Sequence, residues 1–250
     1  MSSRIVPPQR GYPFYVTAKR YRFNGCEPQH PEALTLLLLH STSFHKEIYE
    51  PTFDELALCL IRSAAVGAPK IKEAWVVECP NHGESAILNQ ELLKQPMYED
   101  YFSCETYAEA AYHFLNATDA NGRPYINCPE SKMIGIGHSL GGVSMMFLSA
   151  KVKFASLIII DPFIFAGKPE DLRKLRERLV RCAHERQDVW PTREKARESL
   201  LKKQWDSRIL DLYVTMYRDP DGATKPIPDL RRACSRIPVH IAFGKKSDIM

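Results

Sequence analysis

The sequence lacks a long hydrophobic run. Its strongest apolar stretch, residues 34–39, is interrupted by Thr35, whereas a membrane-spanning helix needs about 20 apolar residues. Residues 1–10 also lack the apolar segment of a secretion signal. We therefore expect no transmembrane segment and no secretion.

Paired cysteine motifs are missing as well. The chain has 7 cysteines, an odd number, with no C-x-x-C motif and no spacing to histidine that is typical of zinc ligands. This pattern predicts reduced thiols in an intracellular protein. We expect no bound metal and no cofactor.

The charges form no block of one sign and are not interleaved with aromatic residues, so the sequence gives no indication of nucleic-acid binding. The net charge of +4 is nevertheless uneven. Residues 168–236 contain 18 basic and 12 acidic residues, a net charge of +6, which leaves −2 for the remainder. Either this segment attracts an anionic substrate or it is a solvated helical surface.

The sequence does contain an alternation of strand-like and helix-like segments. Nearly continuous apolar runs are typical of strands buried on both faces, and alternation with helices predicts a mostly parallel α/β sheet covered on both sides. Strands are expected at 15–23, 34–39, 74–77, 133–136, 157–160 and 238–243, and helices near 53–64, 107–116 and 142–151.

One long segment has a different character. Leu172, Leu175 and Leu179 recur at helical spacing among many charges, and Pro191 indicates a new helix start. We interpret the segment as a helical insertion that covers the active site as a lid; the alternative is a helical layer packed elsewhere on the sheet. The expected domains are a first core part at 1–166, a lid insertion at 167–235 and a last core part at 236–250.

The motif with the clearest chemistry is MIGIGHSLGG at 133–142. It places Ser139 between Gly137 and Gly141 as G-x-S-x-G after an apolar run, which is the pattern of a nucleophile elbow. The glycines allow the strand and the following helix to pass closely. We expect Ser139 to be a catalytic nucleophile rather than a residue of an ordinary strand-to-helix turn.

A serine nucleophile requires a base, an acid that orients the base, and donors for the oxyanion. The backbone N–H of Leu140 is one expected donor, and that of Thr42, in the loop after strand 34–39, is the other. Asp161 follows strand 157–160, and Asp248 follows the last strand. Either aspartate is a candidate for the acid, although each is also compatible with a turn or loop role.

These motifs together resemble the α/β-hydrolase superfamily. Within it, the chain is similar to a branch of fungal and bacterial proteins that includes peroxisomal lipases and hydrolases of fungal toxin pathways. The resemblance implies an α/β-hydrolase fold with a helical lid, and it favours Asp161 over Asp248 as the acid. The segments that carry it, besides the elbow, are HSTSFHKEIYEP (40–51), ECPNHGES (78–85), DVWPTREKA (188–196) and WDSRILDLYV (205–214).

The resemblance also implies a function. We expect a serine esterase or thioesterase that acts on a small-molecule ester or acyl-CoA in secondary-metabolite (toxin) biosynthesis, in the peroxisome or alternatively in the cytoplasm. In this superfamily the catalytic histidine follows the position of Asp248, and the chain stops at Met250. We therefore expect that the last strand, the last helix and this histidine are absent, because the sequence is either incomplete or a degenerate copy.

Two other functions remain open at this point. A degenerate hydrolase would act as a non-catalytic binding protein. Alternatively, Gly135, Gly137 and Gly141 with Asp161 after the next strand resemble a dinucleotide site, although Leu140 stands where that fingerprint requires a small residue. Nothing in the sequence indicates an oligomeric state.

Overall fold

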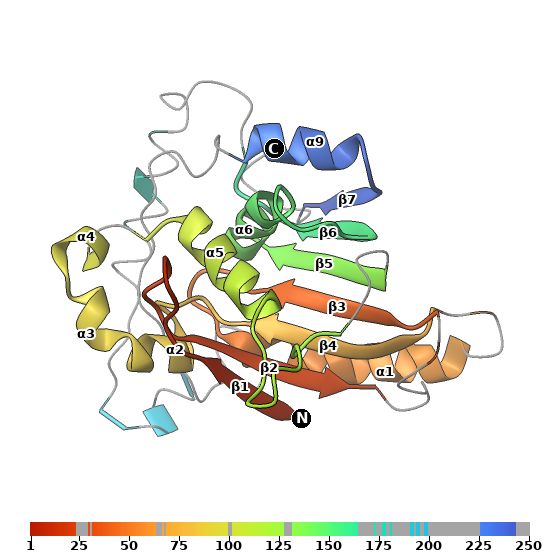
Figure 1. The fold of residues 1–250 in the computed structure, drawn as a ribbon, viewed down its shortest axis with the longest axis horizontal. Coiled ribbons are helices and arrows are strands. Elements are labelled where there is room, and N and C mark those ends of the chain that lie inside the picture. The colour runs from red at the N-terminus through yellow and green to blue at the C-terminus, as the bar shows by residue number, and fades with distance from the viewer. Residues whose placement is uncertain are drawn as a thin grey trace.

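A computed structural model of the chain describes residues 1–23, 30, 32–63, 67, 69–99, 102–127, 132–164 and 226–243, with isolated residues between 173 and 199. A single twisted sheet runs through the described part, with helices on both of its faces (Figure 1). Among the described residues, no helix combines the length and the apolar character that crossing a membrane requires.

The sheet has seven strands in the order β1-β2-β4-β3-β5-β6-β7. The five strands from β4 to β7 in this order are parallel to one another, whereas β1 and β2 are antiparallel to their neighbours. This arrangement confirms the predicted mostly parallel α/β sheet. The strands are β1 (Ser2–Val6), β2 (Val16–Arg22), β3 (Leu34–Leu39), β4 (Ile71–Val77), β5 (Met133–His138), β6 (Ser156–Ile160) and β7 (Val239–Ala242).

The described helices divide between the two faces of the sheet and its carboxyl edge. Helix α1 covers one face, and α5, α6 and α9 cover the other (Figure 1). The arrows of the parallel strands point toward the side on which α2, α3 and α4 lie. The helices are η1 (Lys46–Tyr49), α1 (Glu50–Ser63), α2 (Gly83–Leu88), α3 (Gln90–Leu93), α4 (Pro96–Glu99), α5 (Cys104–Leu115), α6 (Leu140–Leu148) and α9 (Ile227–Cys234).

Strand β3 shows why an unbroken apolar run belongs at the centre of this sheet. Successive side chains of a strand point to opposite faces. Leu37 and Leu39 therefore join the core beneath α5 and α6, whereas Leu36 and Leu38 join the core that contains Phe53 of α1. Both faces are covered, so neither set of positions tolerates polar residues easily.

Several elements were not predicted from the sequence, each because its own residues give a weak signal. Strand β1 buries only Val6 fully, so it carries little hydrophobic signal. Helices α2, α3 and α4 have 6, 4 and 4 residues, which is too short for helical periodicity to show in the sequence. The predicted insertion at 167–235 lies largely outside the described residues; its described part at 227–234 forms α9, which packs against α6. The domain boundaries remain predictions.

Helix α6 packs very closely against the end of β3. A Cβ atom on Gly141 would lie 2.2 Å from the carbonyl oxygen of Leu39, and one on Gly137 would lie 2.4 Å from the carbonyl oxygen of Gly141. Both contacts are with backbone, which cannot move aside as a flexible side chain can. The two glycines of the G-x-S-x-G motif are thus required by packing.

We predict that Gly141→Ala destabilises the fold by about 1–3 kcal/mol or more, because overpacking forces backbone shifts. Gly142→Ala is the matched control. Its Cβ would meet Ile159 Cγ2 at 3.1 Å and the carbonyl oxygen of Gly137 at 3.2 Å, and alanine's higher helix propensity offsets part of this crowding. Urea unfolding followed by circular dichroism measures both; equal losses of stability would contradict the packing argument.

Candidate functional site

Ser139 occupies the sharp turn between the end of β5 and the start of α6. Its backbone has φ 50° and ψ −112°, a region that costs a residue with a side chain about 1–3 kcal/mol. Two hydrogen bonds hold this conformation: the Ser139 N–H donates to the Ile160 carbonyl (2.8 Å), and the Ser139 carbonyl accepts from the Val143 N–H (3.1 Å). The residue is half-buried, so it remains accessible.

The two expected oxyanion donors lie at the same edge of the sheet as Ser139. Leu140 is the first residue of α6, where a helix leaves its N–H groups without intrahelical acceptors. Thr42 lies in the loop after β3, next to Ser43, which has φ 67°. A Cβ atom on Gly141 would lie 2.6 Å from the His40 carbonyl oxygen. The start of the Thr42 loop therefore rests against the first turn of α6.

His40 is a structural residue of this loop. Its Nε2 accepts a hydrogen bond from the Cys79 N–H (3.0 Å), so the proton is assigned to Nδ1, which donates to the Ser41 carbonyl (2.9 Å). Complete burial lowers the pKa of His40 to about 3. The ring is therefore neutral at physiological pH and ties the ends of β3 and β4 together.

His82 holds the same loop from the opposite side. Its Nε2 accepts from the Ser43 N–H (3.2 Å), and its Nδ1 donates to Asn81 Oδ1 (2.6 Å). Burial lowers the pKa of His82 well below its ordinary value. A neutral imidazole thus fixes the residue that follows Thr42.

Tyr107 of α5 completes these supports. Its hydroxyl donates to the Val77 carbonyl (2.7 Å) and accepts from the His40 N–H (3.0 Å). The ring is fully buried, and burial raises the pKa of the hydroxyl well above its ordinary value. A neutral phenol therefore links the last residue of β4 to the first residue after β3.

A buried carboxylate, Glu78, lies directly beneath these loops. One oxygen, Oε2, accepts from Thr17 Oγ1 (2.8 Å), the Ser85 N–H (3.0 Å) and Lys46 Nζ (3.0 Å). The other, Oε1, accepts from the Lys46 N–H (3.2 Å). Glu78 thereby joins β2, the first residue of η1 and the first turn of α2.

Lys46 is buried with Glu78, which is unusual for a lysine. Its Nζ also lies 3.0 Å from Glu84 Oε2 and 3.7 Å from Glu47 Oε1. Burial alone lowers the pKa of Lys46, but Glu78 and Glu47 raise it by more, so the pKa lies above its ordinary value. The lysine therefore remains charged.

Gly83 makes room for this ion pair. A Cβ atom there would lie 2.2 Å from Glu78 Oε1, and the residue has φ 49°, which favours glycine. The sequence analysis did not single out Lys46, Glu78 or Gly83. The available signal was that these residues lie within 40–51 and 78–85, two of the segments that carry the family resemblance.

Asp161 and Ser139 follow the carboxyl ends of two adjacent strands, β6 and β5. Asp161 follows Ile160, whose carbonyl accepts the Ser139 N–H, and it has φ 44°. Burial lowers the pKa of His138, while the charge of Asp161 raises it. Asp248 falls outside the described residues, so the structure places only one of the two candidate acids.

The glycines of the elbow are accounted for by contacts within the protein. A Cβ atom on Gly135 would lie 2.7 Å from both Leu157 Cδ2 and Met145 Sδ, and Gly137 and Gly141 abut backbone. Close packing thus explains these glycines without a bound dinucleotide. Among the described residues, no group of three or more His, Cys, Asp or Glu side chains is placed to hold a metal ion.

Comparisons with known proteins agree with this geometry. The model of a family described as "Alpha/beta hydrolase family" matches residues 36–245. A curated relative, "Type I acyl-CoA thioesterase mpaH" of Penicillium brevicompactum, is 27% identical over 240 residues, covering 93% of this chain and 49% of its own length. "Abhydrolase domain-containing protein AKT2" of Alternaria alternata is 34% identical over 89 residues, 34% of this chain and 33% of that protein. The chain spans about half the length of the first relative and of others like it.

Solved structures show the same fold. The peroxisomal alpha-beta-hydrolase Lpx1 of Saccharomyces cerevisiae aligns with a TM-score of 0.58 at 16% identity, covering 99% of this chain and 75% of that chain. The thioesterase domain from the curacin biosynthetic pathway aligns with a TM-score of 0.60 at 12% identity, covering 100% and 85%. At these identities the likeness concerns the fold alone.

We predict that Glu78→Gln destabilises the protein by about 3 kcal/mol or more, because it removes the main partner of a buried ammonium group. Adding Lys46→Met should cost less than the sum of the two single changes, since the two side chains are coupled. The control is Lys94→Met, which removes an exposed lysine paired with Glu91 and should change stability by less than about 1 kcal/mol. Urea unfolding measures all four variants; additive losses would argue against a coupled pair.

We also predict that stability falls as the pH drops below about 6.5. His40 and His82 have lowered pKa values in the folded protein, so the unfolded chain takes up their protons first. Their stabilising contribution is complete above pH 6.5 and declines as the pH falls toward the folded-state pKa of each ring, which is about 3 for His40. The decline is up to about 1.4 kcal/mol per pH unit for each ring. Unfolding free energies at pH 7, 6 and 5 should show a smaller slope for His82→Asn, and an unchanged slope for the exposed control His240→Asn.

Proposed function

The chain belongs to the alpha/beta hydrolase family, and on that premise we propose that it is a serine hydrolase that cleaves an ester or thioester through an acyl-enzyme. The observation that carries the proposal is the backbone of Ser139. A half-buried serine held at φ 50° between a strand and a helix has the strained geometry of a nucleophile elbow. Strain of this kind clusters at functional sites.

In the proposed mechanism, Ser139 Oγ attacks the acyl carbonyl while a histidine takes up its proton. The N–H groups of Leu140 and Thr42 donate to the oxyanion of the tetrahedral intermediate. When the intermediate collapses, the protonated histidine gives its proton to the departing alcohol or thiol, and the acyl group stays on Ser139. Water then attacks in the same way and releases the carboxylic acid.

Asp161 is the proposed acid that orients the histidine and stabilises its charged form. His40 and His82 are not suited to act as that histidine. Each uses both ring nitrogens in hydrogen bonds to the loops, and the pKa of each lies far below the range in which an imidazole accepts a proton at neutral pH. They support the proposed oxyanion loop, and in this superfamily the base is a histidine that follows the position of Asp248.

The relatives support a substrate class. Proteins with the name acyl-CoA thioesterase match nearly the whole chain, so we propose a small-molecule acyl thioester or ester as the substrate. The matches to Alternaria alternata proteins and the resemblance to toxin-pathway hydrolases support a place in fungal secondary metabolism. The peroxisomal yeast neighbour supports a peroxisomal location, with the cytoplasm as the alternative.

The decisive test is labelling of the purified chain with a fluorophosphonate probe, beside the variant Ser139→Ala. We expect labelling that disappears in the variant, because only an activated serine reacts with the probe. Absence of labelling in a demonstrably folded wild-type protein would show that no base activates Ser139 in this chain, and would favour a degenerate or incomplete hydrolase whose function lies in binding. Release of free thiol from a panel of acyl-CoA esters then identifies the acyl group.

We predict that Asp161→Asn lowers kcat by about 10³-fold or more with a small effect on KM, because the histidine loses its orienting charge. The control is Asp54→Asn, an exposed position on α1, which should leave kcat within about twofold. Steady-state kinetics with a thioester substrate measures both. A variant of Asp161 with unchanged kcat would remove this residue from the proposed triad.

A further inference from the structure

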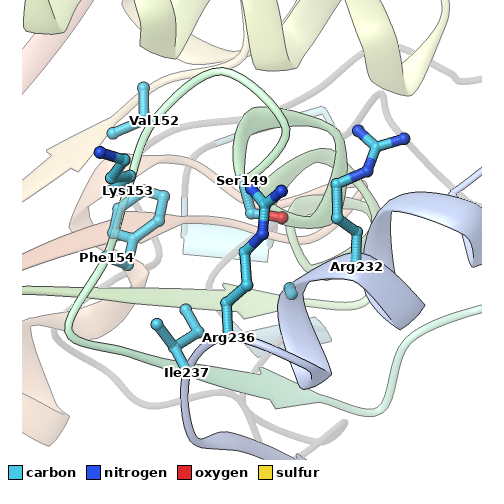
Figure 2. Close-up of a pocket in the computed structure, with 8 residues that line it drawn as sticks. Ser149, Val152, Lys153, Phe154, Arg232, Arg236 and Ile237 are labelled. Carbon is cyan, nitrogen blue, oxygen red and sulfur yellow. The ribbon is translucent and has the colours of Figure 1, made fainter.

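A cavity of about 410 Å³ lies between the ends of α6 and α9 (Figure 2). Ser149 at the end of α6 and the segment 152–154 form one part of its wall. Arg232 and Ala233 of α9, followed by Arg236 and Ile237, form the other. A volume of this size is typical of sites for small molecules.

This cavity is separate from the site around Ser139. Ser139 follows the carboxyl end of β5, whereas Phe154 precedes β6 and Ile237 precedes β7. Because β5, β6 and β7 are parallel, these two groups of residues lie at opposite edges of the sheet. A ligand in the cavity would therefore not touch the proposed nucleophile.

The walls combine an apolar surface with positive charge. Phe154 and Ala233 are buried and belong to the hydrophobic core, with Val152 and Ile237 packed against it. The three cationic side chains at the cavity are Lys153, Arg232 and Arg236, and none of its described lining residues is acidic.

The two arginines are the distinctive feature. Arg232 and Arg236 are four residues apart, and Figure 2 shows them extending in a similar direction from the α9 side. Arg236 lies two residues beyond the end of α9, and like charges that line one cavity disfavour each other. The described counter-charge is Asp229, which lies 3.3 Å from Arg232 in an exposed pair, and such pairs contribute little. An anion between the guanidinium groups would relieve this repulsion.

We propose that this cavity binds a small amphiphilic anion, with a carboxylate or phosphate head at Arg232 and Arg236 and a short apolar body against Val152, Phe154 and Ile237. Guanidinium groups present planar pairs of donors that match both kinds of head group. The apolar wall selects against a free inorganic ion. The site stands independently of the chemistry at Ser139.

The competing explanation is that the cations only complement helix ends. Both α6 and α9 end at this cavity, and the last carbonyls of a helix attract positive charge. That role requires no concave apolar wall and predicts no ligand. Binding measurements therefore separate the two explanations.

The test is isothermal titration calorimetry of the full chain with octanoate and octyl phosphate, using octanol, octyltrimethylammonium and inorganic phosphate as comparisons. We expect saturable binding of the two amphiphilic anions, at least tenfold weaker binding of octanol and inorganic phosphate, and none of the cation. Binding should weaken as salt concentration rises, because screening reduces the attraction of the arginines. If octanoate binds more strongly than octyl phosphate, the head group is a carboxylate, and the reverse order indicates a phosphate monoester; both orders support the site.

The double variant Arg232→Ala/Arg236→Ala locates the binding. Both side chains are exposed, so the fold should persist, which circular dichroism and thermal unfolding verify. We expect the affinity for octanoate to fall about tenfold or more, since each charge-assisted hydrogen bond contributes substantially. Arg231→Ala, on the same helix but outside the cavity, is the matched control and should stay within twofold. Absence of saturable binding, equal affinity for octanol and octanoate, or equal affinity of the double variant and wild type would each overturn the proposal.

Discussion

The buried ion pair between Glu78 and Lys46 is the interaction on which the candidate site depends. Two charges removed from water are favourable only when hydrogen bonds satisfy them fully, and here the carboxylate accepts from Thr17, Ser85 and both nitrogens of Lys46. The neutral rings of His40 and His82 continue this network to the loop that carries Thr42. The carboxyl edge of the sheet, where the candidate site lies, is thus built on a polar core beside the apolar one.

Much of the fold could be predicted because its information is local. The run at 34–39 coincides with β3, because burial on both faces requires a continuous apolar run. The elbow at 137–141 lies at the junction of β5 and α6, where close backbone contacts require glycine. Strand β1 and the short helices α2 to α4 could not be predicted in this way. Few of their residues are buried, and the helices are too short for a periodic hydrophobic pattern to appear.

The site was predictable in part for the same reason. Ser139, Leu140 and Asp161 follow the carboxyl ends of neighbouring strands, and parallel topology alone brings them to one edge. The roles of Lys46, Glu78 and Gly83 depend on contacts between segments about 30 residues apart. Hydrophobic periodicity in the sequence does not predict contacts of this kind. The same holds for the cationic cavity, whose two walls come from residues about 80 positions apart.

Three described residues other than glycine have positive φ, namely Ser43, Ser139 and Asp161, and all three lie at the carboxyl edge of the sheet. Each conformation opposes folding, so the remainder of the sheet must supply the free energy that maintains them. Glycine at any of these positions would relax the backbone while removing a side chain from the site. The carboxyl edge is therefore the part of the sheet where the backbone lowers the stability of the fold, at three separate points.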